Sequence, residues 1–63
     1  MLHNTGSVID NGTIYQNVNF VDSPEKADKE IRYDKMGYNK EDNCWLYFYH
    51  GYLVATVKGN DAA

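Results

Sequence analysis

The residues of this chain whose types could support catalysis are few and poorly spaced for it. Cys44 and His50 are the only thiol and imidazole close together in the sequence, on a predicted strand and its turn. A nucleophile and base pair is not expected there, and Cys44 suits a small buried apolar site. His3 and His50 could bind a metal with a carboxylate, but no His-x-x-x-His or Cys-x-x-Cys spacing occurs. The sequence predicts a protein that is not an enzyme and uses no cofactor or metal.

The chemistry that the sequence does support is that of a binding surface, and it lies near the C-terminus. Two segments rich in β-forming residues, 44–49 and 52–57, are separated by His50-Gly51, a pair that suits a hairpin turn. The loop length then places Tyr49 opposite Tyr52. Continuing this register gives one aliphatic face, predicted to be core, with the pairs Phe48 and Leu53, Leu46 and Ala55, and Cys44 and Val57.

The opposite face of this hairpin is aromatic, where a solvated sheet face would be polar. The predicted pairs on it are Tyr49 with Tyr52, Tyr47 with Val54, and Trp45 with Thr56. Tyrosine and tryptophan are over-represented at protein interfaces. The alternative is that the helix or the N-terminal hairpin covers this face as part of the core. If it is exposed, four of its residues form a partner-binding aromatic stripe: Trp45, Tyr47, Tyr49 and Tyr52.

Carboxylates are segregated from this aromatic hairpin. The segment 44–57 contains none, whereas the preceding turns and the predicted helix carry several. Acidic residues beside the stripe would steer the approach of a basic partner. The lysines at positions 26, 29, 35 and 40 dilute this negative field, so the chain is not expected to be a strict DNA mimic. The acidic residues predicted to contribute to partner binding are Glu25, Asp28, Glu41 and Asp42.

The N-terminal third of the chain predicts a second hairpin. Asn11-Gly12 between two β-favouring segments is a strong hairpin signal, because both residues tolerate the positive φ that such turns require. The turn sets Ile9 opposite Ile14 and Val8 opposite Tyr15. Strand alternation then predicts a core face made of Ile14, Val18 and Phe20.

A helix is predicted between the two hairpins. Ser23-Pro24 suits its first turn, because serine caps helices and proline fits the first helical position. The helix would run to about Met36, with Gly37 as its stop. Alternatively, the helix ends near Glu30 and a strand follows from Ile31 to Tyr38, where apolar and polar residues alternate.

These elements predict one small α+β domain over residues 1–63, of order ββαββ, in which two hairpins form one antiparallel sheet and one helix packs on it. A mostly β fold is the alternative. A chain of 63 residues with a single cysteine is marginal in stability, so a homodimer is expected. It has no apolar run long enough to span a membrane and no basic, apolar leader at its start. We therefore expect a cytoplasmic location, in the host cell if the protein is viral.

For function, the sequence favours a non-enzymatic module that binds a partner protein. A basic host enzyme is the kind of partner expected. In size, acidity and lack of catalytic motifs the chain resembles the broad class of phage and mobile-element inhibitors that includes uracil-DNA glycosylase inhibitors and anti-restriction proteins. It matches no motif of any one such family. The class implies an inhibitor that occludes a host nucleic-acid enzyme or defence complex. One alternative is a sheet that stacks single-stranded nucleic acid on the same aromatics, although net charge −3 and the lack of a basic groove disfavour it. The other is a structural homodimer whose interface is the stripe.

Overall fold

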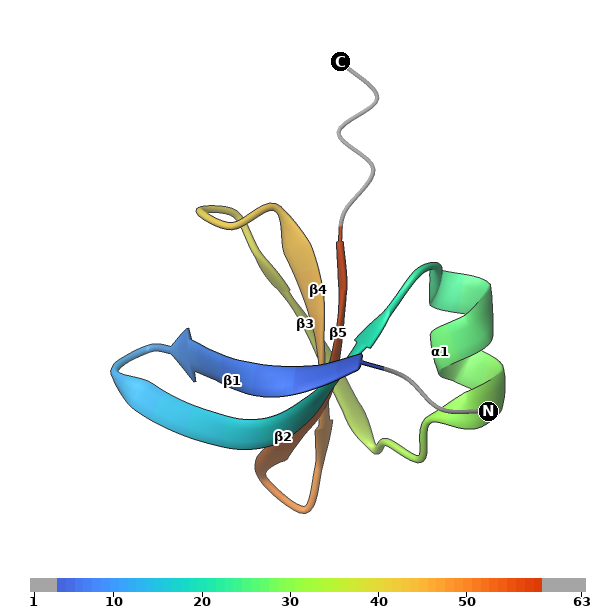
Figure 1. Cartoon of the computed structure of the whole chain (residues 1–63), viewed down its shortest axis with the longest axis horizontal. Helices are drawn as coiled ribbons and strands as arrows, with labels where there is room; N and C mark the ends of the chain where they lie inside the picture. The colour runs from blue at the N-terminus through green and yellow to red at the C-terminus, as the bar shows by residue number, and fades with distance from the viewer. Residues whose placement is uncertain (1–3, 59–63) are drawn as a thin grey trace.

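The computed structural model describes residues 4–58, so His3 lies outside the described part of the chain. These residues form one short helix and five strands in the order ββαβββ (Figure 1). Within them, no helix is long and apolar enough to cross a membrane. The elements are β1 (Asn4–Asp10), β2 (Thr13–Val21), α1 (Pro24–Glu30), β3 (Lys35–Asn39), β4 (Cys44–Tyr49) and β5 (Tyr52–Lys58).

The strands form one mixed sheet in the order β1-β2-β5-β4-β3. Strands β2 and β5 are parallel, and all other neighbours are antiparallel. The prediction of a wholly antiparallel sheet of two hairpins is therefore wrong: an additional strand, β3, precedes the second hairpin, and the hairpins join through a parallel pair. The cause is the connection through α1, which passes over the sheet and returns the chain to the end where β2 began. The architecture fits both the α+β class and the mostly β alternative.

The helix begins where the sequence predicts and ends earlier. The Ser23 side chain accepts a hydrogen bond from the Lys26 N–H at 3.2 Å, and Pro24 is the first helical residue. The helix ends at Glu30 rather than near Met36, and the next residue, Ile31, is extended with φ −108° and ψ 129°. Its apolar stripe is too short to hold a longer helix, since Ala27 is its only buried residue. A strand follows, as in the predicted alternative, but it runs from Lys35 to Asn39 and not from Ile31 to Tyr38.

The first hairpin has the predicted turn but only part of the predicted core. Ile9 pairs with Ile14 and Val8 with Tyr15, across a turn whose two residues have φ values of 50° and 82°. The register then shifts, and Asn17 adopts a positive φ of 60°. This β-bulge resets the alternation of side chains along β2. The predicted core face is wrong at two positions. Ile14, which precedes the bulge, no longer shares a face with the buried Val18 and is 61% exposed. Phe20, two residues after Val18 on the same face, lines an open cleft and is 41% exposed.

The second hairpin is also bulged. Tyr49 pairs with Tyr52 and Phe48 with Leu53, as predicted, across His50 and Gly51. The register shifts at the next position, which leaves Val54 and Ala55 together opposite Tyr47. The predicted pairs beyond this point are therefore wrong: Tyr47 pairs with Ala55, Leu46 with Thr56, Trp45 with Val57, and Cys44 with Lys58.

Two small apolar clusters cover the two faces of the sheet. On the helix-side face, Ala27 of α1 packs with Val21, Tyr47, Ala55 and Val57. On the other face, which we call the hairpin-side face, the β1–β2 hairpin runs across the β3–β5 meander (Figure 1). The buried residues there are Val18, Leu46 and Leu53, with Val8, Tyr15, Cys44 and Phe48 packed around them. Burial of each fully buried aliphatic side chain in the two clusters stabilises the fold by about 1.5–3 kcal/mol.

Candidate protein-binding surface

The four residues of the aromatic stripe lie in different environments. Tyr47, expected to be exposed, is only 2% exposed, because α1 and the segment that follows it lie over this part of β4. The ring of Tyr33 meets the Tyr47 ring edge-on, with 4.7 Å between centroids. The prediction that Tyr47 contacts a partner is therefore wrong, and the alternative in which the helix covers the stripe holds at this residue.

Trp45 lies on the same face beyond the end of the helix cover. It is half-buried, and its ring contacts that of Tyr38 in β3 at a centroid distance of 4.9 Å. Tyr38 is 45% exposed and Met36 is 48% exposed. Met36 pairs with Tyr47 and Tyr38 with Trp45, so these side chains share the helix-side face. We call Met36, Tyr38 and Trp45 the aromatic edge surface.

The other two residues of the stripe do not extend this surface. Tyr49 is half-buried, stacked on the His50 ring at 4.0 Å, with the Arg32 guanidinium 6.0 Å from its centroid. Tyr52 is 45% exposed, but it leans onto β2. Its hydroxyl donates to the Gln16 carbonyl oxygen at 3.1 Å and accepts from the Gln16 N–H at 2.8 Å. Tyr52 therefore serves the contact between β5 and β2.

The predicted acidic residues divide into two groups. Glu41 and Asp42 lie in the turn between β3 and β4, just beyond Tyr38 at the end of the aromatic edge surface. Asp42 also lines a cleft on the hairpin-side face. The Asn39 side-chain oxygen accepts hydrogen bonds from both of their N–H groups, at 2.9 and 3.2 Å, which fixes the turn. The Tyr38 hydroxyl donates to the Asn43 side chain at the other end of the same turn. An ordered acidic turn thus borders the exposed aromatic rings.

Glu25 and Asp28 lie on α1 and do not border that surface. Glu25 is exposed in the first turn of the helix. The Asp28 carboxylate accepts a hydrogen bond from the Tyr33 hydroxyl at 2.7 Å. This bond is the main cause of the raised pKa of Tyr33, with desolvation second. Burial raises the pKa of Tyr47, and the Asp28 charge adds to the effect, so both phenols stay neutral at ordinary pH.

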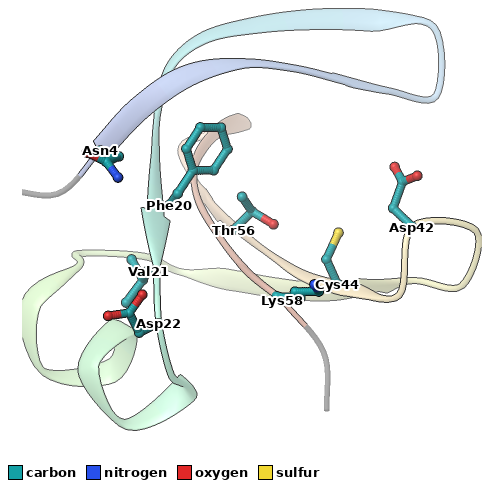
Figure 2. A pocket seen from close by; sticks show the side chains of 8 residues that line it. All are labelled: Asn4, Phe20, Val21, Asp22, Asp42, Cys44, Thr56 and Lys58. Carbon is teal, nitrogen blue, oxygen red and sulfur yellow. The ribbon is translucent and has the colours of Figure 1, made fainter. Parts of the chain in front are cut away.

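A second feature is an open cleft of about 500 Å³ on the hairpin-side face. Figure 2 shows Phe20, Thr56 and Cys44 projecting into the space between β2 and the adjoining ends of β4 and β5. The Cys44 thiol is half-buried, and it lies at the opposite end of β4 from His50. Among residues 4–58, no three His, Cys, Asp or Glu side chains are grouped closely enough to hold a metal ion. The remaining cleft residues are Asn4, Val21, Asp22, Asp42 and Lys58.

Sequence reasoning found Trp45, Glu41 and Asp42 but missed Met36 and Tyr38. It assigned Met36 to the end of a helix, where a strand position was only the alternative. The signal for their role was the alternation of Met36 and Tyr38 with Lys35, Gly37 and Asn39, which is the pattern of a short strand with one apolar face. The chain matches no protein-family model, and no curated protein or solved structure is significantly similar to it.

Proposed function

We propose that this protein is a non-enzymatic binding domain that contacts a partner protein through the aromatic edge surface and the Glu41-Asp42 turn. The observation that carries the proposal is the exposure of Met36 and Tyr38 on one sheet face, beside the half-buried Trp45. All three residue types are enriched at interfaces: tyrosine and tryptophan bring large contact areas with limited loss of conformational freedom, and methionine adapts its flexible side chain to the partner. The helix leaves these three side chains uncovered.

The charge beside this surface supports a basic partner. Glu41 and Asp42 are both exposed, and the Asn39 side chain holds their backbone in place. Fixed carboxylates at the rim of an apolar contact speed association with a positively charged protein and disfavour acidic competitors. Net charge −3 adds to this steering. A nucleic-acid enzyme or defence complex of a host cell has a positively charged surface of this kind. A protein that covered this surface would inhibit the enzyme or complex.

The same geometry gives less support to single-stranded nucleic acid as the ligand. Base-stacking platforms combine aromatic rings with Lys and Arg that follow the backbone phosphates. Here the turn beside Tyr38 carries Glu41 and Asp42 along with Lys40. This turn would repel phosphates next to the exposed ring of Tyr38.

The test is a binding comparison between two double variants of the full chain. Met36→Glu with Tyr38→Ser removes the aromatic edge surface. The matched control is Ile9→Ser with Ile14→Ser, because Ile9 and Ile14 are exposed apolar neighbours on the first hairpin, at 62% and 61%. Proteins retained from host lysate by the wild-type chain are identified, purified and titrated against all three chains.

We expect one purified partner to bind the wild type and the control alike and the edge variant at least about tenfold more weakly. Glu41→Lys with Asp42→Lys should slow association while leaving dissociation nearly unchanged. Equal affinity of the edge variant would overturn the proposal. So would tight binding of a thymidine oligonucleotide that weakens steeply with salt, since this is the signature of phosphate contacts.

A further inference from the structure

Strand β3 ends the sheet with an edge that nothing in residues 4–58 pairs with. It pairs with β4 in an unbroken register from Lys35 to Asn39 and contains no proline. The opposite edge, β1, belongs to a bulged ladder. Bulges and prolines are two of the features that discourage edge strands from pairing with other chains, together with charged side chains such as that of Lys35. Of the two edges, β3 is therefore the one open to a further strand.

The hydrogen-bonding alternation of β4 shows which backbone groups of β3 face outward. His50 and Gly51 have φ values of 52° and 82°, a type I′ turn, so Tyr49 directs its N–H and C=O toward β5. The hydroxyl of Thr56 in β5 accordingly donates to the Trp45 carbonyl oxygen at 2.9 Å. The intervening residues of β4 face β3, as the bond from the Asp34 N–H to the Phe48 carbonyl oxygen illustrates.

The residues of β3 paired with those positions are Lys35, Gly37 and Asn39, whose N–H and C=O groups therefore point to β4. The alternate residues, Met36 and Tyr38, point theirs away from the sheet. The open edge consequently presents two N–H and two C=O groups, placed symmetrically about Gly37. The same two residues carry the exposed side chains of the aromatic edge surface.

We propose that two copies of this chain pair antiparallel through β3, about a two-fold axis at Gly37, and join two five-stranded sheets into one. In this register Met36 of one copy lies opposite the partner's Tyr38, and both residues use their outward backbone groups. The two side chains lie on the helix-side face and form apolar cross-strand pairs. Gly37 meets its own symmetry mate, and nothing lies within 4 Å of where its Cβ would be.

Charge complementarity at the strand ends fits the same register. One residue beyond each end of β3, Asp34 comes opposite the partner's Lys40, and the symmetry makes this pair twice. In the single chain the Asp34 carboxylate accepts from the His50 N–H at 3.2 Å, on the β4 side of β3, so dimerisation would exchange this bond for the contact with the partner's lysine. Lys35 lies opposite the partner's Asn39, so the paired strands bring no like charges together.

The dimer would bring the two aromatic edge surfaces side by side on one face of the joined sheet. Helix α1 packs over β2 and β5, away from the joining edge, and leaves that face open. The dimer itself does not depend on the proposed function. Contact of a basic partner with the merged surface, in contrast, rests on the proposed function. Such an association would also stabilise the folded chain, by an amount that rises with the logarithm of its concentration.

The first test is sedimentation equilibrium of the full chain over a wide concentration range, with Met36→Pro and Met36→Ala as a matched pair. Proline removes the outward N–H of residue 36 without removing a bond to β4, and edge strands tolerate it at such positions. Alanine keeps that N–H. We expect a dimer for the wild type, a weaker dimer for Met36→Ala and a monomer for Met36→Pro.

A charge exchange keeps the proposal testable if the proline variant does not fold. In Asp34→Lys each introduced lysine faces the partner's Lys40, and in Lys40→Asp each introduced aspartate faces the partner's Asp34. Each variant alone should dimerise more weakly than the wild type, and a mixture of the two should form a mixed dimer favoured by roughly tenfold. Recombination of the variants also shows that both are folded.

A wild-type chain that stays monomeric at every concentration would overturn the dimer, as would a dimer that a folded Met36→Pro leaves unchanged or charge variants that show no preference for mixing. These outcomes are separate from those of the proposed function. Loss of partner binding in the Met36→Glu and Tyr38→Ser variant, together with a monomeric wild type, would leave the proposed function standing alone. If the wild type is a dimer and the Met36→Glu and Tyr38→Ser variant still binds the partner, the dimer would stand and the proposed function would be overturned.

Discussion

Tyr47 and Tyr38 lie on the same face of the sheet, on neighbouring strands, yet one is core and the other is surface. Tyr47 is 2% exposed, and Tyr38 is 45% exposed. Tyr38 pairs with Trp45, and Trp45 follows the alternation of β4 to the same side as Tyr47. Strand alternation therefore sets the face of each ring, and something else sets whether the ring meets solvent.

The deciding factor is the reach of α1. A helix of 7 residues is about 10 Å long, whereas five strands side by side span about 19 Å. The helix packs over β2 and β5, and Tyr33 extends its cover to Tyr47 on β4. The cover ends there, so the far edge of the same face stays open. We call these two parts of the helix-side face the covered half and the open half.

The largest expected difference between the halves is in stability. Tyr47→Ala removes a buried ring and should lower the free energy of unfolding by about 3–5 kcal/mol, enough to unfold a domain this small. Tyr38→Ala, the matched change in the open half, should alter it by no more than about 1 kcal/mol. Chemical denaturation of both variants at one protein concentration measures the contrast. Similar losses in the two variants would mean that α1 does not divide the face.

The parts of this fold that could be predicted from the sequence are those set by a few adjacent residues. Asn11-Gly12 and His50-Gly51 form the expected turns, because asparagine, histidine and glycine tolerate positive φ. Ser23 caps the helix as expected, because its hydroxyl needs only a backbone N–H three residues on. The first pairs beside each turn follow from loop length alone.

The parts that could not be predicted depend on residues far apart in the sequence. Asn17 and Val54 lie at bulges, and each bulge moves the following residues to the other face, which is why Ile14 does not share the buried face of Val18 and why Val57 joins the helix-side cluster. That Tyr47 is buried while Trp45 is only half-buried and Tyr38 is exposed depends on where a short helix stops. No periodicity in the sequence of β4 carries that information.

A smaller change should weaken the covered half by way of the helix. Ser23→Ala removes the acceptor of the Lys26 N–H and should lower the free energy of unfolding by about 1 kcal/mol. Ser7→Ala, at an exposed serine in β1, is the control and should have little effect. The measurement is the denaturation midpoint at constant slope. Acrylamide quenching of Trp45 should not change in Ser23→Ala, because Trp45 belongs to the open half; increased quenching would show that the helix cover reaches further.

The smallest expected effect is on the dependence of stability on alkaline pH, and it arises in the covered half. The hydrogen bond to Asp28 raises the pKa of Tyr33, and burial raises the pKa of Tyr47. Folding thus favours the protonated phenols, and their contribution is complete below the ordinary tyrosine pKa. It is lost as the pH rises through the raised pKa values of the folded state.

Asp28→Asn separates the two causes behind this alkaline loss. Removing the carboxylate should lower the pKa of Tyr33 toward its ordinary value, because the charge that opposes ionisation is gone and the asparagine amide oxygen that replaces it is a weaker acceptor of the phenol proton. The pKa of Tyr47 should fall less, since burial is the first cause there. Titration of tyrosinate absorbance gives both shifts, with Glu25→Gln on the same helix as the control. A titration curve unchanged by Asp28→Asn would mean that the Tyr33 hydroxyl is not held by α1, and the boundary between the two halves would then lie nearer the helix.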